Sequence, residues 1–448
     1  MINALGNIFK IEDLKRKIII TLLLLVVYRI GCYIPTPGIN ARALAEFFER
    51  ISRTQGSTIF GILNMFSGGA MERLTVFALG IMPYISSSII LQLLTAVIPS
   101  LERLSKEGKA GYEKINQYTR YGTVILALVQ SFFIALWLEN SRYFEGIQIV
   151  SHPGLGFKLL TMLTLTTGTI FIMWLGEQIQ ELGIGNGISL IITAGIISRI
   201  PAAFHQLYIL FSPFAPSRRQ IAPATLIIMA VLLVCVVWAV TLITQAQRKI
   251  PVQYARRVVG RKIYGGQSTY IPLKVDTAGV IAIIFAQSII LLPATIASFI
   301  PHPFFQKWAQ FMMRGHLFYT VIYAILIILF CYFYTAIVFN PIELAENMKK
   351  YGGFIPGIRP GAPTAEFLNF VMTRITLAGA IFIAFIAIFP DFIMVLLKVP
   401  YLVASFFGGT GILIVVGVML DTIKQIESYL LIHHYEGFLK TGRIKGRR

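Results

Sequence analysis

Residues 222–244 read APATLIIMAVLLVCVVWAVTLIT, a run without a single charged side chain. An α-helix needs about 20 apolar residues to cross the hydrocarbon core of a bilayer, so this run predicts a membrane-spanning helix. The composition of the whole chain agrees, because 56% of its 448 residues are hydrophobic and only 13% are charged. Soluble domains are about one-quarter charged, so the sequence predicts a membrane protein.

Nine further runs of this kind predict an all-α polytopic membrane protein with ten transmembrane helices. The predicted spans are residues 18–35, 74–98, 118–138, 157–176, 187–205, 222–244, 277–297, 317–339, 368–389 and 401–420. An even number of spans puts both termini on one side. About two-thirds of the 39 Lys and Arg residues lie on that side, which predicts cytoplasmic termini and explains the net charge of +19 without nucleic acid.

The ten spans divide into two halves of five, residues 1–200 and 222–448, joined by the proline-rich connection 201–221. An odd number of spans per half makes the second half begin on the opposite side, which is the geometry of an inverted repeat. We interpret the connection as a hinge. The second half also carries two long cytoplasmic loops, 245–276 and 340–366, and a basic tail.

The segment 57–71 is apolar but too short to span a bilayer, and Gly68 and Gly69 separate it from the next helix. Backbone that ends within the membrane needs protein or a water-filled cavity to satisfy its polar groups, so a half-helix inside the bundle is predicted. An interfacial helix on the outer surface is the alternative.

Two helices each present a pair of isoleucines four residues apart, Ile81 with Ile85 and Ile188 with Ile192. This spacing places both members of a pair on one helix face. Such faces could ring a pore as a hydrophobic constriction. Ordinary helix packing or lipid contact explains the same spacing, and periodicity does not choose between them.

Uncharged polar side chains interrupt several apolar spans; we single out Ser87, Gln92, Gln130, Gln287 and Ser288. Hydrogen bonds between such side chains hold membrane helices together at about 0.6 to 2 kcal/mol each, weak enough to be remade. They predict either a reversible seam between helices or static contacts.

No catalytic or metal-binding pattern is found. The cysteines Cys32, Cys235 and Cys331 have no CxxC spacing, and all histidines and carboxylates fall outside mid-membrane positions. The glycine-rich loop 183–189 lacks the spacing of a phosphate cradle and is interpreted as a tight turn in which Asn186 caps the following helix. No enzyme activity, metal or cofactor is predicted.

The two long loops are rich in basic residues and suit a phosphate backbone or an acidic partner. Attraction of positive charge to anionic lipid is the alternative. The docking candidates are Arg248, Arg256, Arg257 and Arg261 in the first loop and Arg359 in the second.

Several motifs from the first span to the tail resemble the bacterial SecY family. They are Asn64-Met-Phe-Ser-Gly-Gly69, Phe77-Ala-Leu-Gly-Ile-Met-Pro-Tyr-Ile-Ser86, Met173-Trp-Leu-Gly-Glu-Gln178, Gly183-Ile-Gly-Asn-Gly-Ile-Ser189 and Gly357-Ile-Arg-Pro-Gly361. The resemblance implies the channel subunit of the Sec translocon in the bacterial inner membrane, which passes unfolded secretory chains and releases apolar helices sideways into lipid.

The resemblance also implies roles for individual residues. The pore ring of the family falls on Ile81, Ile85, Ile188, Ile192, Ile284 and Ile414. The plug falls on Phe60, Ile62, Leu63, Asn64, Met65, Phe66, Ser67, Gly68 and Gly69. The lateral gate lies between spans two and three on one side and seven and eight on the other, and the five polar residues become candidates for its seam.

The implied partners are the small membrane subunits SecE and SecG, the motor ATPase SecA, the ribosome, signal peptides and nascent chains. SecA and the ribosome are expected on the basic loops. The alternative function is a secondary transporter of a small solute built on the same inverted halves. Against it stands the absence of a predicted charged residue in the interior that could couple an ion.

Overall fold

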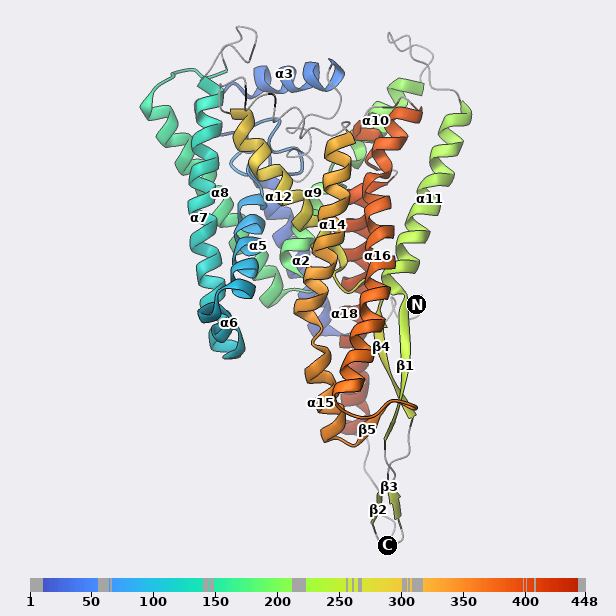
Figure 1. Cartoon of the computed structure of the whole chain (residues 1–448). Coiled ribbons are helices and arrows are strands. Elements are labelled where there is room, and N and C mark those ends of the chain that lie inside the picture. The colour runs from blue at the N-terminus through green and yellow to red at the C-terminus, as the bar shows by residue number, and fades with distance from the viewer. Residues whose placement is uncertain are drawn as a thin grey trace.

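The computed structural model describes residues 11–54, 64, 67–139, 144, 149–211, 223–254, 257–259, 262–264, 268–299, 304, 307, 317–397, 399, 401–406 and 408–441. Long helices dominate this part of the chain and run side by side (Figure 1). They are α2 (Glu12–Gly31), α5 (Met82–Val97), α7 (Lys109–Glu139), α8 (Leu155–Leu182), α9 (Gly187–Ile197) continued by α10 (Ile200–Phe211), α11 (Pro223–Gln245), α12 (Gly279–Phe299), α14 (Leu317–Val338), α16 (Ala362–Leu397) and α18 (Gly409–Thr441).

Seven helices of the described chain are long and apolar enough to cross a membrane by themselves. An eighth crossing is the bent pair of α5 and α6 (Pro99–Lys106), whose axes meet at 100°. The apolar part of α12, Gly279–Leu291, is shorter, and α2 begins with five charged residues within Glu12–Lys17. Together these helices form the predicted ten-helix architecture.

The second span begins later than the predicted residue 74. Residues 67–81 form a series of turns, in which Gly80 has a φ of 59° and Leu74 a φ of 39°. These left-handed conformations cannot continue a right-handed helix. The helix α5 starts at Met82, with Pro83 in its first turn. Proline is tolerated there because a backbone N–H in the first turn has no partner within the helix.

The proline-rich connection that follows span five is not a loop throughout. Its first part, Ile200–Phe211, forms α10, and Pro201 lies in the first turn of that helix. Residues 212–222 lie outside the described residues. The tenth span also differs from the prediction, because the short α17 (Tyr401–Ala404) precedes α18, which begins at Gly409.

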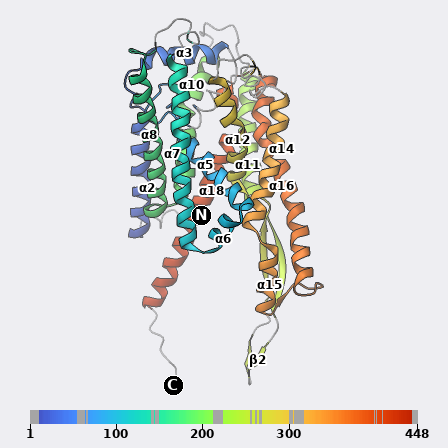
Figure 2. The same ribbon diagram turned by 60° about the vertical axis from the view of Figure 1, so that its left-hand side comes forward.

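A largely apolar core joins the bundle, and a second apolar cluster closes one end. There the amphipathic helix α3 (Ala41–Thr54) lies across the helix ends (Figures 1 and 2). Its Leu44, Phe47 and Phe48 are buried against Trp137 and Phe144. Burial of this face fixes α3 over the end opposite to α15 (Pro341–Lys350).

The two long loops contain a small antiparallel sheet that was not predicted. Its strand order is β4 (Ser268–Lys274), β1 (Gln247–Tyr254), β5 (Gly353–Phe354), and a separate pair joins β2 (Arg257–Val259) with β3 (Lys262–Tyr264). Ile250 pairs with Ile271 across β1 and β4, and Gln253 pairs with Phe354. The sheet therefore joins loop 245–276 to loop 340–366.

Candidate functional site: a sealed pore through the bundle

Six isoleucines, which lie on α5, α9, α12 and α18 or directly before α5, belong to the large apolar cluster that joins the helices of the bundle. Ile81 precedes α5 directly, Ile284 lies on α12, and Ile414 lies on α18. Five of the six side chains are buried and Ile188 is partly buried against them; the set is Ile81, Ile85, Ile188, Ile192, Ile284 and Ile414. Packing of α12 on α5, and of α18 on α9 and α12, brings them together. All six predicted ring residues therefore lie in the same large apolar cluster, and their role as a pore ring stays a prediction.

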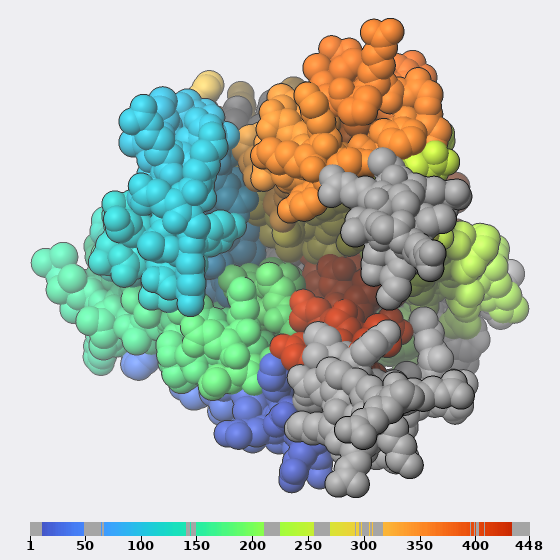
Figure 3. Space-filling model, turned by 90° about the horizontal axis from the view of Figure 1, so that it is seen from below, coloured from blue at the N-terminus to red at the C-terminus, as the bar shows by residue number. Residues whose placement is uncertain are grey.

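A cavity of about 680 Å³ opens next to this cluster. Asn186 and Ser189 line it from the start of α9, while Ile283 on α12 and Leu413 on α18 lie beside ring residues. The space-filling view from the end that carries α15 shows this face hollowed, with α18 at the floor of the hollow (Figure 3). The cavity leads from this face to the isoleucine cluster, a feature that no sequence pattern indicated.

The turn before α9 has the predicted form. Gly185 has a φ of 87°, which suits glycine, and the side chain of Asn186 accepts a hydrogen bond from the backbone N–H of Ser189 at 3.1 Å. The predicted helix cap is confirmed. This cap fixes the start of α9, the helix that carries Ile188 and Ile192.

A carboxyl group with a raised pKa lines the same cavity. The pKa of Asp276 is raised to about 6, mainly by burial and in smaller part by the charge of Asp421. The backbone N–H of Gly279 donates to Asp276 Oδ1 at 2.7 Å, which acts in the opposite direction. This hydrogen bond lies at the first residue of α12 and holds that helix start against the cavity.

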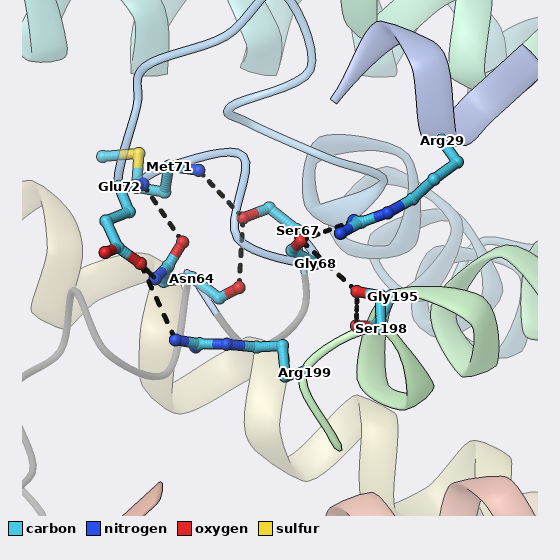
Figure 4. A network of polar contacts seen from close by, with 9 residues as sticks. All are labelled: Arg29, Asn64, Ser67, Gly68, Met71, Glu72, Gly195, Ser198 and Arg199. Atoms are coloured by element: carbon cyan, nitrogen blue, oxygen red, sulfur yellow. Dashed lines mark hydrogen bonds and ion pairs between the residues drawn. The ribbon is translucent and has the colours of Figure 1, made fainter. Parts of the chain in front are cut away.

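Polar contacts hold the described part of the short segment 57–71 against α2 and the end of α9 (Figure 4). Arg29 on α2 donates from Nη1 to the Gly68 carbonyl oxygen at 2.8 Å, and Ser198 Oγ donates to the same oxygen at 3.4 Å. Gly68 has a φ of 65°, and a Cβ atom there would lie 3.0 Å from Gly195 Cα. Of the predicted plug residues, Phe60, Ile62, Leu63, Met65 and Phe66 lie outside the described residues.

A second group of polar contacts involves the carboxylate of Glu72. Asn64 Nδ2 donates to Glu72 Oε2 at 3.0 Å, and the Glu72 backbone N–H donates to Asn64 Oδ1 at 3.1 Å. Arg199 Nη2 lies 3.8 Å from the same Oε2 (Figure 4). These contacts cross-link the segment to the point where α9 ends and α10 begins.

The expectation of an interior without charged residues is therefore wrong. Arg29 lies on α2, and Arg199 lies within the apolar stretch Gly187–Ile209 with its side chain only 14% exposed. Both cations are tolerated because a backbone carbonyl or a carboxylate compensates for lost water. Sequence reasoning missed Arg29, Glu72 and Arg199 as site residues.

The polar seam candidates make hydrogen bonds within the two predicted sides. Ser87 Oγ donates to the Thr119 carbonyl oxygen on α7 at 2.8 Å, and Tyr323 on α14 donates to Gln287 Oε1 on α12 at 2.9 Å. Gln92 donates to Ser88 within α5 at 3.2 Å. Each of these three bonds lies within one side of the predicted lateral gate. Across the gate, α12 packs against both α5 and α7. Gln130 is half-buried on α7 and Ser288 is buried on α12.

Three of the predicted docking arginines, Arg248, Arg257 and Arg359, lie in or beside the strands of the two long loops. Arg248 is exposed on β1, and Arg359 is exposed in the loop after β5. Apolar packing of Ile250 and Val252 against Met348 and Leu368 holds the two loops together. Arg257 begins β2. Arg256 and Arg261 lie outside the described residues.

The three cysteines are free thiols, with Cys32 and Cys331 buried and Cys235 exposed on α11. Within the part of the chain that the structure describes, no three His, Cys, Asp or Glu side chains group as metal ligands.

Comparison with known proteins agrees with this architecture. The SecY family model matches residues 75–423. The protein translocase subunit SecY of Aquifex aeolicus is 45% identical over 441 residues, covering 98% of this chain and 100% of that one. The subunit of the same name from Escherichia coli K12 is 47% identical over 439 residues, covering 97% and 96%.

Solved structures share the fold. A structure described as that of a protein conducting channel superposes with a TM-score of 0.66 at 18% identity, covering 93% of both chains. Another, described as showing that the plug domain of SecY stabilises the closed channel, has a TM-score of 0.62 at 20% identity and covers 93% of this chain and 92% of that one. The chain therefore belongs to the SecY family, the pore-forming subunits of the protein translocase.

Proposed function

We propose that the six isoleucines form the constriction through which unfolded secretory chains pass, and that segment 57–71 is the plug that seals it. The observation that carries this proposal is the position of one apolar cluster between an open cavity and the polar contacts of Gly68 and Glu72. An apolar constriction excludes water and ions by dewetting and still yields to a flexible guest.

The lateral gate is assigned to the boundary between the pair α5 and α7 and the pair α12 and α14. The contacts of α12 with α5 and α7 close this boundary, and they are packing contacts that a partitioning signal helix can replace. The halves 1–200 and 222–448 are assigned to the two sides, with 201–221 as the hinge between them. Ser87, Gln92, Gln130, Gln287 and Ser288 line the two sides.

Partners are assigned to the α15 end of the molecule. Sec61, a similar structure with a TM-score of 0.63 at 18% identity, has been solved in a canine ribosome-channel complex. The exposed Arg248 and Arg359 suit the ribosome or the motor ATPase SecA, and Arg256, Arg257 and Arg261 belong to the same basic loop. SecE and SecG complete the complex, and anionic lipids neutralise remaining basic charge in a bacterial inner membrane with both termini cytoplasmic.

The test is reconstitution of the chain with SecE, SecG and SecA in lipid vesicles. We expect ATP-dependent protection of a secretory precursor from external protease, with its signal peptide and nascent segment held in the channel. A precursor that stays exposed while a small solute accumulates would contradict the channel function.

The docking assignment has its own test in Arg359→Glu. The Arg359 side chain is exposed, and the substitution keeps the backbone carbonyl that accepts a hydrogen bond from Thr364 Oγ1 at 2.9 Å, so the channel should still fold. We expect SecA-driven export to fall severalfold while complex assembly is unchanged. Normal export would remove Arg359 from the docking surface.

A further inference from the structure

The helix α18 is longer than the run of about 20 residues that crosses a bilayer. It begins at Gly409, carries Ile414 in the large apolar cluster, and continues to Thr441. At 1.5 Å per residue, Tyr429 lies about 22 Å further along the helix than Ile414. Figure 2 shows this end of α18 projecting from the bundle. We call residues 421–431 the α18 extension.

The α18 extension lines the cavity that opens next to the apolar cluster. Asp421, Lys424 and Ser428 belong to this lining, and their spacing of three and four residues places them on one face of the helix. Other parts of the lining come from the starts of α9 and α12, at Asn186 and Asp276. A movement of the α18 extension would therefore change the width of the cavity.

A neighbouring face of the α18 extension is tied to the first helix of the described chain. Lys17 Nζ on α2 donates a hydrogen bond to the Tyr429 hydroxyl oxygen at 2.8 Å. The same ammonium lies 4.2 Å from the centroid of the Tyr429 ring, a cation–π distance. The two residues are 412 positions apart in the sequence, so this contact joins α2 to the far end of the chain.

Two further contacts join the α18 extension to α2 and to the turn before α9. The backbone N–H of Gly185 donates to Gln425 Oε1 at 2.9 Å. Leu14 and Ile184 are buried in a small apolar cluster of their own, and Ile426 packs against it. Both α2 and this turn precede the connection 201–221, whereas α18 follows it. The contacts therefore hold the extension against the other half of the chain.

We propose that these three contacts form a clasp that holds the α18 extension as a fixed wall of the entry cavity, and that the clasp limits how bulky a translocating chain can be where it enters. This inference rests on the proposed function. Lys17, Gln425 and Tyr429 are positioning residues in it. An unfolded chain fits beside a fixed wall, whereas a covalently closed loop is wider and requires the wall to move. Loss of the clasp leaves the extension attached mainly through its continuation into the bundle, so the wall can move outward.

The experiment compares two forms of one secretory precursor in vesicles that contain the chain with SecE, SecG and SecA. The precursor carries two cysteines that close a short loop when they are oxidised to a disulfide. The oxidised and reduced forms have the same signal and sequence, so they differ in the width of the entering chain. ATP-dependent protection of each form from external protease is measured, and the ratio of oxidised to reduced export reports the width of the entrance.

The clasp is weakened by Tyr429→Phe, which removes the hydroxyl and keeps the ring, by Lys17→Met, and by Lys17→Met combined with Gln425→Leu. A contact of this kind at an exposed site changes an equilibrium by about twofold to fivefold. We expect the export ratio to rise by about twofold in Lys17→Met and on the order of fivefold in the combined variant. Lys17→Arg keeps a donor and a cation over the ring and should keep the native ratio, a rescue that a general loss of structure would not give.

The matched control is Lys15→Met, which removes the same charge from the same helix. Lys15 is exposed, and neither the clasp nor the cavity lining includes it. A native ratio in the combined variant, or an equal rise in Lys15→Met, would overturn the proposal. So would a matching loss of reduced and oxidised export in Tyr429→Phe and Lys17→Met, because the contacts would then support the fold alone. Failure of the native chain to export the reduced precursor would instead contradict the channel function itself.

Discussion

The apolar cluster that holds the six isoleucines and the polar contacts of Asn64, Gly68 and Glu72 lie next to one another, but they hold the structure by opposite physical means. The cluster uses non-directional apolar contact among side chains such as Ile192 and Ile414. The plug segment uses directional contacts, including the Arg29 bond to the Gly68 carbonyl and the Glu72–Arg199 pair. Non-directional contact can re-form around any guest, whereas a directional contact is either made or broken.

This difference suggests separate tasks for the two regions. An apolar ring can remain in contact with a passing chain of any sequence, because hydrophobic contact depends on area and not on orientation. The polar contacts hold only one arrangement of the segment and so define a closed state.

Ile414→Asn breaks the apolar region. Ile414 is fully buried, and an unsatisfied buried amide costs about 1 to 3 kcal/mol, so water should enter the ring. We expect the resting ion conductance in planar bilayers to rise on the order of tenfold. Ile414→Val, which keeps the apolar surface, is the control, and equal conductance in both variants would remove Ile414 from the pore.

Gly68→Ala strains the polar region. The φ of 65° costs an L-residue about 1 to 2 kcal/mol, and the new Cβ lies 3.0 Å from Gly195 Cα. We expect a smaller rise in resting conductance than in the ring variant, on the order of fivefold. Gly69→Ala separates the causes, because its φ is 89° but no heavy atom lies within 4 Å of the new Cβ.

Arg29→Lys sharpens the comparison by keeping the charge and removing the planar fork. The arginine donates to both the Gly68 carbonyl and the Tyr33 hydroxyl, whereas a lysine ammonium cannot span both with the same geometry. We expect a rise in conductance of about twofold to threefold. Native conductance would show that charge alone, and not the directional pair of bonds, holds Gly68.

Arg120→Gln should have the smallest effect. Arg120 makes a bidentate pair with Glu177 at 2.8 and 2.9 Å, but the two side chains are 47% and 26% exposed. Exposed pairs contribute about 0.2 to 1 kcal/mol, so the thermal unfolding midpoint of the purified complex should fall only slightly. A large drop would mean that this pair contributes more to stability than exposed ion pairs usually do.

The sequence predicts the apolar region far better than the polar one. Helical spacing puts Ile81 with Ile85 on one face, and the family resemblance adds Ile284 and Ile414. All six isoleucines lie in one large apolar cluster, and their role as a ring stays a prediction. The number of helices also follows from hydropathy, since each crossing needs a long apolar run. Helix starts such as Met82 differ because local left-handed turns, including Gly80, override the apolar pattern.

The polar contacts could not be derived from spacing. Glu72 and Arg199 are far apart in the sequence, and each taken alone is indistinguishable from a charge at a helix end. The small sheet did leave a signal, because Ile250 and Val252 alternate with exposed residues along β1. The many basic residues of the same loop favour a docking surface as the interpretation and make this alternation less evident.

The antiparallel pairing of β1 with β4 and β5 has a mechanical consequence. A force applied to the loop that carries Arg359 reaches β1 through the Gln253–Phe354 and Tyr254–Gly353 pairs. From β1 the force passes to the end of α11, which precedes β1 in the chain, and through β4 to the start of α12. The sheet thus links the two loops mechanically. A partner that pushes on either loop therefore applies force to the helices that flank both loops.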